Sequence, residues 1–176
     1  MRIALSGKMK SGKTTLAREL DYQNVVSFAD PIRNALAELG IHKSEYPDLY
    51  RRGAQYLGTD LCRTFDPDWW VKWMNARMMY DRQNVRSTII DDVRFPNEYD
   101  WCKASGFMLV RLDISREMQY TRGAEEGTFN HPSETGLDHI GKEEWDLWLP
   151  EQTSVQERVS AILSCLPREL PHPSGF

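Results

Sequence analysis

A glycine- and lysine-containing octapeptide near the start of the chain restricts its fold more than any other feature. Residues 7–14 read GKMKSGKT and match G-x-x-x-x-G-K-[ST] at every fixed position. The apolar segment 2–6 precedes the octapeptide, and residues 13–20 follow it with three apolar side chains at the spacing of one helical face. The pattern therefore indicates a strand, a tight turn and a helix, an arrangement in which backbone N–H groups cradle phosphates.

Each fixed position of this loop has a chemical reason. The glycines allow the backbone to fold tightly, so that successive N–H groups point at phosphate oxygens. We expect the Lys13 ammonium to bridge the β- and γ-phosphates of ATP and the Thr14 hydroxyl to ligate Mg²⁺. ATP and Mg²⁺ are therefore the predicted cofactors. The residues predicted to bind ATP in this loop are Gly7, Lys8, Lys10, Ser11, Gly12, Lys13, Thr14 and Thr15.

Strand-like and helix-like segments alternate along the chain. The predicted strands are residues 2–6, 25–29, 88–91, 107–113 and 145–149. The last predicted helix begins with a capping box formed by Ser154 and Glu157. Its apolar stripe comprises Val155, Val159, Ile162, Leu163 and Leu166. Strands separated by helices predict a three-layer α/β fold, with a central parallel sheet and helices on both faces.

Composition narrows the range of partners. A chain of 176 residues suffices for one domain with a hydrophobic core, and a net charge of −4 argues against a surface that coats nucleic acid. No apolar run approaches the roughly 20 residues of a membrane span, and no signal peptide is visible. Three scattered cysteines suggest neither disulfides nor a zinc site. We expect a cytoplasmic protein without nucleic-acid or membrane partners.

Carboxylates follow another predicted strand directly. Asp91 and Asp92 end the apolar segment Ile89–Ile90, and Arg94 lies two residues further on. A carboxylate at this end of a strand beside the phosphate loop can hold hydrated magnesium, and the arginine can reach a phosphate. We assign the metal to Thr14 and Asp92, with Asp91 as the alternative. A charged loop in which Arg94 merely pairs with a nearby carboxylate remains open.

The segment 48–65 predicts a helix with two different faces. One face carries Arg52, Gln55, Thr59 and Arg63. The opposite face carries Tyr50, Ala54, Leu57 and Leu61, which would seat the helix on the core. Two arginines, an amide and a hydroxyl suit a nucleoside monophosphate, although an ordinary solvated face fits the spacing equally well. Trp70, in the following segment, could stack on a base, although tryptophans there are more often core.

Residues 114–138 are polar and carry arginines and glycines, as a mobile lid over a phosphoryl-transfer site would. Arg122 is the predicted transition-state cation and Arg116 a predicted ATP contact. A flexible surface loop with incidental arginines is the alternative.

Six segments occur in a distinctive order: SGKMKSGKTTLA, FADPIRNAL, RRGAQYLGTDLCR, DPDWW, IIDDVRFPNE and HPSETGLD. In these segments, from about residue 1 to residue 138, the chain resembles bacteriophage-type deoxynucleoside monophosphate kinases. The resemblance implies a single P-loop kinase domain at 1–166, with a substrate-binding helical insertion at about 40–82, a lid at about 114–138 and a tail at 167–176. It also implies a deoxynucleoside monophosphate as the acceptor of the γ-phosphate of ATP, a location in the host cytoplasm if the protein is phage-encoded, and often a homodimer.

Carried over by position, the resemblance also assigns residues. The implied acceptor-binding residues are Asp30, Arg33, Arg52, Gln55, Thr59, Arg63, Trp70 and Arg94. The residues expected to act in catalysis are Lys13, Asp92, Arg94 and Arg122. Other P-loop kinases, of dephospho-coenzyme A or of nucleosides, and a nucleotide-binding switch remain the alternative functions.

Overall fold

Five parallel strands form the centre of the molecule. The computed structural model describes residues 2–20, 24–81, 87–124 and 129–166, so the predicted tail and residues 125–128 of the predicted lid lie outside the described residues. The sheet has the order β2-β3-β1-β4-β5. Its strands are β1 (Arg2–Gly7), β2 (Val25–Val26), β3 (Thr88–Val93), β4 (Met108–Leu112) and β5 (Leu147–Leu149). The predicted α/β fold with a parallel sheet is confirmed.

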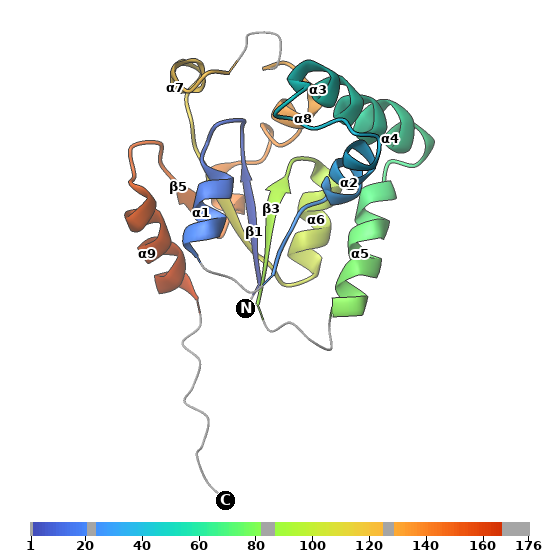
Figure 1. Cartoon of the computed structure of the whole chain (residues 1–176). Coiled ribbons are helices and arrows are strands. Elements are labelled where there is room, and N and C mark those ends of the chain that lie inside the picture. Colours follow the sequence, from blue (N-terminus) through green and yellow to red (C-terminus); the bar gives the residue numbers. More distant parts are fainter. Residues whose placement is uncertain (1, 21–23, 82–86, 125–128, 167–176) are drawn as a thin grey trace, which may run out of the picture.

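The strands are apolar on both sides, so helices cover both faces of the sheet (Figure 1). Ile3 and Leu5 of β1 pack toward α1 (Lys13–Glu19) and α9 (Val155–Cys165). Ala4, between them, points to the other face. The helices on that face are α2 (Asp30–Glu38), α5 (Trp69–Asp81) and α6 (Pro96–Ala104). Since all five strands run in one direction, their carboxyl ends meet at one edge of the sheet.

The predicted helix 48–65 is present, with an irregular centre. It consists of α3 (Pro47–Gln55), a π-helical stretch at Tyr56–Leu61 and α4 (Cys62–Phe65). In a π-helix each turn takes in more than four residues, a feature frequent at functional sites. The Trp70 indole donates a hydrogen bond to the Gly58 carbonyl oxygen at 2.9 Å, which ties the π-helical stretch to α5.

Two details of the apolar faces differ from the prediction. Leu163 is 53% exposed, because α9 turns Ile162 toward the sheet and its neighbour points away. Leu61 is 47% exposed, whereas Leu57 packs against the core as predicted. The capping box is confirmed: the Ser154 hydroxyl accepts from the Glu157 N–H at 3.2 Å, and the Glu157 carboxylate accepts from the Ser154 N–H at 2.7 Å.

Short helices complete the described chain between the last strands. They are α7 (Arg116–Thr121), α8 (Pro132–Thr135) and a 3₁₀ turn at Lys142–Glu144. Among the helices of the described residues, none has the length and apolar character needed to cross a bilayer.

Candidate active site

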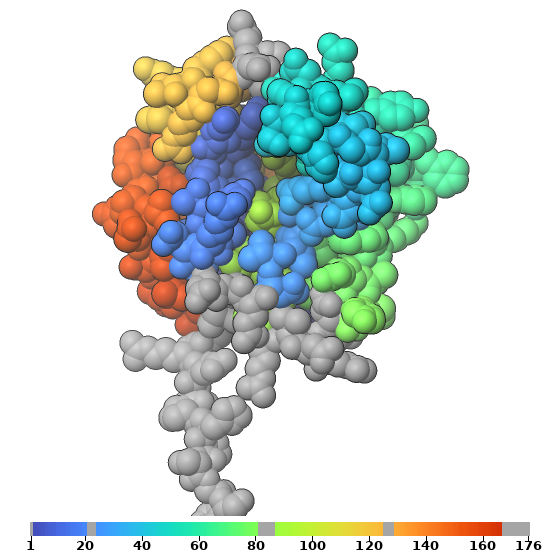
Figure 2. All heavy atoms as spheres, viewed as in Figure 1, coloured from blue at the N-terminus to red at the C-terminus, as the bar shows by residue number. Residues whose placement is uncertain are grey.

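A cleft of about 790 Å³ opens at the carboxyl ends of β1 and β3. Its walls come from the loop after β1, from α2 and α3, from the end of β3, and from residues 122–123 and 131–134 (Figure 2). The volume is in the range of small-molecule sites. Of the predicted ATP-binding residues, Lys10, Ser11, Gly12, Lys13, Thr14 and Thr15 line this cleft.

The loop between β1 and α1 is closely packed. A Cβ atom on Gly7 would lie 2.6 Å from the Ser11 hydroxyl oxygen and 2.7 Å from the Leu112 carbonyl oxygen, so only glycine fits there. The Lys13 ammonium turns back on the loop and donates to the carbonyl oxygens of Gly7 and Lys8, the latter at 3.1 Å. Gly7 and Lys8 are therefore part of the loop's frame and do not belong to the cleft walls.

Two buried arginines that the sequence analysis missed support this loop. Arg158 of α9 donates to the Ser11 carbonyl oxygen at 2.9 Å, and Arg111 of β4 donates to the Ser6 hydroxyl at 2.9 Å. A signal for Arg158 was present in the sequence, because it lies at i+3 from Val155 and at i−4 from Ile162, on the buried side of α9. A charged residue on an apolar stripe indicates a buried partner.

Burial changes the acidity of Lys13. Desolvation, together with the positive charges of Arg94 and Arg111, lowers the pKa of the Lys13 ammonium from 10.5 to about 7. The carboxylates of Glu134 and Asp91 act in the opposite direction. These couplings show that Lys13, Arg94 and Asp91 share one electrostatic environment, although they come from different elements.

The two aspartates of β3 have different tasks. Both oxygens of Asp92 accept hydrogen bonds from the backbone N–H groups of residues 28–29, at 2.7 and 3.0 Å. Burial, together with the charge of Asp91, raises the pKa of Asp92 to about 7. Within the described chain only one oxygen of Asp91 accepts a hydrogen bond, from the Ser27 hydroxyl, and its charge influences Lys13. The geometry thus favours Asp91, the alternative, as the carboxylate that faces the phosphate loop.

Six of the eight predicted acceptor residues line the same cleft, and Asp30 and Arg52 do not. Gln55, Thr59, Arg63, Trp70, Arg33 and Arg94 line the cleft. Arg52 is exposed and lies outside the cleft walls, which include Arg51 instead. Both arginines are compatible with the sequence spacing, because Gln55 is i+4 from Arg51 and i+3 from Arg52.

Two of the acceptor-side arginines are held by neighbouring groups. Arg33 donates to the Ser27 hydroxyl at 2.8 Å and pairs with Asp30 at 3.1 Å, so Asp30 acts on the cleft through Arg33. The Arg63 guanidinium lies over the Phe95 ring at 3.8 Å and pairs with the buried Glu98. This packing leaves Arg63 at the cleft wall in a fixed orientation.

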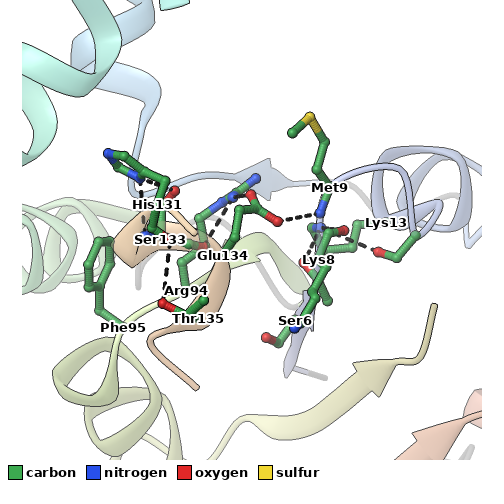
Figure 3. Close-up of polar contacts among 12 residues, drawn as sticks. Ser6, Lys8, Met9, Lys13, Arg94, Phe95, His131, Ser133, Glu134 and Thr135 are labelled. Atoms are coloured by element: carbon green, nitrogen blue, oxygen red, sulfur yellow. Dashed lines mark hydrogen bonds and ion pairs between the residues drawn. The ribbon is translucent and has the colours of Figure 1, made fainter. Parts of the chain in front are cut away.

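Of the two predicted lid arginines, one lines the cleft and the other does not. Arg122 lines the cleft and donates to the Lys10 carbonyl oxygen at 2.9 Å. Arg116 stacks on the Phe129 ring at 4.8 Å and is not part of the cleft walls. Glu134, which the sequence analysis did not assign, contacts both the phosphate loop and Arg94 (Figure 3).

The glycine-rich loop at the end of the central strand, set in a parallel sheet with helices on both faces, defines a P-loop kinase-like α/β protein. Two solved structures agree with this fold. A sugar kinase from Janibacter sp. HTCC2649 is 18% identical with a TM-score of 0.56, over 93% of this chain and 92% of that chain. Shikimate kinase from Aquifex aeolicus vf5 is 18% identical with a TM-score of 0.51, over 93% and 94%.

Sequence comparisons define the family. The deoxynucleotide monophosphate kinase family matches residues 40–147. An Acanthamoeba polyphaga mimivirus protein named "Putative deoxynucleotide monophosphate kinase" is 30% identical over 195 residues, covering 93% of this chain and 95% of that protein. The chain belongs to the deoxynucleotide monophosphate kinase family and is a phosphotransferase that uses nucleotides. The predicted family is confirmed.

The low pKa of Lys13 predicts a pH dependence of stability. From about pH 7 to 10.5 the unfolded chain binds a proton at Lys13 that the folded chain has lost, so this residue makes the free energy of unfolding rise with pH. In Lys13→Met that contribution is absent. Between pH 7 and pH 9, we expect the free energy of unfolding of the wild-type protein to rise by about 1 to 2 kcal/mol more than that of Lys13→Met. Urea unfolding of both proteins measures this difference. Parallel pH profiles of the two proteins would contradict the buried, desolvated ammonium.

Proposed function

We propose that this protein transfers the γ-phosphate of ATP to the 5′-phosphate of a deoxynucleoside monophosphate, giving ADP and a deoxynucleoside diphosphate for DNA synthesis. The observation that supports the proposal most strongly is that two cationic side chains, Lys13 and Arg94, line the same cleft. Lys13 belongs to the loop after β1 and Arg94 follows the end of β3, and the positive charge of Arg94 contributes to the lowered pKa of Lys13. Two cations on separate elements suit two phosphate groups that must meet.

The donor side of the cleft fits a magnesium–nucleotide complex. Thr14 and Asp91 both line the cleft and offer a hydroxyl and a carboxylate, the oxygen ligands that Mg²⁺ prefers. Mg²⁺ is commonly bound by one or two protein oxygens together with substrate phosphates. When bound, the ion neutralises phosphate charge. Asp92 then serves to hold the turn before α2, through its bonds to residues 28–29.

The acceptor side fits a nucleoside monophosphate. Arg51, Arg63 and Arg33 surround it with guanidinium groups, which bind phosphate through paired hydrogen bonds. Gln55 and Thr59 lie on the same wall and offer an amide and a hydroxyl for base or sugar. Residues of about 40–82 thus form the proposed substrate-binding insertion within a single kinase domain at 1–166.

The chain's own part in the reaction is positioning and charge stabilisation. Lys13 would support the transferring phosphate, Arg94 the acceptor phosphate, and Arg122 the charge that spreads over both. The acceptor oxygen belongs to a phosphate that is already ionised near neutral pH, so no side chain has to remove a proton from it. Closure of residues 114–138 over the cleft would exclude water from the reaction.

The proposal also covers the partners, the location and the oligomeric state of the protein. The partners are small molecules, without nucleic acid or membrane, and the location is the cytoplasm, that of a host if the protein is phage-encoded. A second copy of the chain could cover an exposed apolar patch at Leu61, Phe65 and Trp69. Phe65 is 83% exposed, and its ring lies 6.2 Å from that of Trp69. We include a homodimer across this patch in the proposal.

An ADP-release assay tests the proposed function. The protein would be supplied with ATP and Mg²⁺, and separately with dAMP, dGMP, dCMP, dTMP and the matching ribonucleotides. We expect slow ADP release without an acceptor and release at least 100-fold faster with one or more deoxynucleotides. Lys13→Ala serves as the inactive control, because it lacks the cation on the transferring phosphate. ATP binding without stimulation by any deoxynucleotide would rule out the proposed acceptor.

Adjacent arginines on α3 provide a matched pair of variants. Arg51 lines the cleft and Arg52 does not. Arg51→Ala should raise the KM for the deoxynucleotide about 10-fold or more, because a phosphate contact of this kind contributes about 1.5 to 3 kcal/mol. Arg52→Ala should leave KM within about twofold. The reverse order of effects would restore the face predicted from the sequence and contradict the cleft described here.

A further inference from the structure

The segment 132–138 packs closely on the residues that surround the phosphate site. A Cβ atom on Gly136 would lie 2.7 Å from the Arg94 carbonyl oxygen, so only glycine allows this approach. The Arg94 guanidinium in turn donates to the Ser133 carbonyl oxygen at 3.3 Å. The segment therefore lies directly on the backbone and the side chain of the proposed acceptor arginine.

Glu134 of this segment joins two parts of the active site. One oxygen of its carboxylate accepts a hydrogen bond from the Met9 N–H of the phosphate loop at 2.6 Å, and the other pairs with the Arg94 guanidinium. Figure 3 shows the carboxylate between the two partners. The Glu134 side chain is buried, and both contacts are partly buried at the cleft wall.

A second carboxylate of the segment also contacts both the phosphate loop and an arginine. Asp138 pairs with Lys8 of the phosphate loop at 2.9 Å and with Arg111 of β4 at 3.5 Å. The segment thus offsets positive charge at two points of the phosphate cradle. Asp138 is half-exposed, whereas Glu134 is buried, so Glu134 restricts its partner more strongly.

Arg94 needs such a restraint. Its long side chain has several rotatable bonds, and ordering a free arginine at the moment of binding costs affinity and rate. A buried carboxylate that already holds part of the guanidinium leaves its remaining N–H groups for a phosphate. Supporting groups of this kind keep catalytic side chains within a fraction of an ångström of the productive position.

We propose that Glu134 is a positioning residue, which anchors Arg94 to the phosphate loop so that its guanidinium faces the acceptor phosphate before the substrate binds. This inference rests on the proposed function, since it takes Arg94 to be the acceptor cation. It differs from a role in which Glu134 occupies a phosphate position and must be displaced. In that case removal of the carboxylate would strengthen nucleotide binding.

The test compares Glu134→Ala and Glu134→Gln with Glu143→Ala, which removes an exposed carboxylate on the 3₁₀ turn. We expect Glu134→Ala to lower kcat with a deoxynucleotide about 10- to 100-fold, while the Kd of ATP changes less than about threefold. Glu134→Gln keeps the volume and one acceptor oxygen, and should lose less. Glu143→Ala should match the wild type. Unchanged kcat in Glu134→Ala and Glu134→Gln, or tighter binding of either nucleotide, would overturn the inference.

A double-mutant cycle separates positioning from a general structural role. If Glu134 acts through Arg94, then Glu134→Ala should lower kcat no further once Arg94→Ala is present. If the double variant lost kcat by the product of the two single-variant factors, the inference would be contradicted. It would also be contradicted if the fall in activity only followed a fall in melting temperature. A wild-type protein that turns over no deoxynucleotide refutes the proposed acceptor as well, whereas an active wild type with an unaffected Glu134→Ala refutes this inference alone.

Discussion

Burial of charged groups, together with repulsion between neighbouring cations, shapes this active site. Desolvation and the nearby guanidinium groups of Arg94 and Arg111 together lower the pKa of Lys13 to about 7. The structure offsets this repulsion with carboxylates from distant segments, chiefly Glu134 and Asp91. Holding these cations close together lowers the stability of the folded protein until the phosphates of the substrates neutralise their charge.

The parallel sheet brings these groups together. The phosphate loop follows β1 and the aspartates end β3, its neighbour, so both meet at the same edge. α9 returns across one face to place Arg158 beneath the loop, and α8 places Glu134 above it. Helix α3 closes the other side of the cleft with Arg51 and Gln55. Each wall thus comes from a different part of the chain.

The sequence predicted the features that local patterns encode. The phosphate loop, the parallel sheet and the helix at 48–65 could be found from spacing alone, and motifs identified the family. It could not choose between Arg51 and Arg52, because both are one helical turn from Gln55. Nor did it assign Glu134, whose partners are 40 and 125 residues away in the chain and meet it only in the folded protein. Contacts of that range leave no local periodicity.

The most direct test of the two-phosphate cleft is a crystal structure with a bisubstrate analogue, in which adenosine and a deoxynucleoside are joined by five phosphates. We expect the phosphate chain to run from the loop at 7–14 to Arg94, with oxygens within hydrogen-bonding distance of both Lys13 and Arg94. The deoxynucleoside should lie beside Gln55 and Arg51 in this arrangement. A phosphate chain that contacts Lys13 but leaves Arg94 without any phosphate oxygen would contradict it.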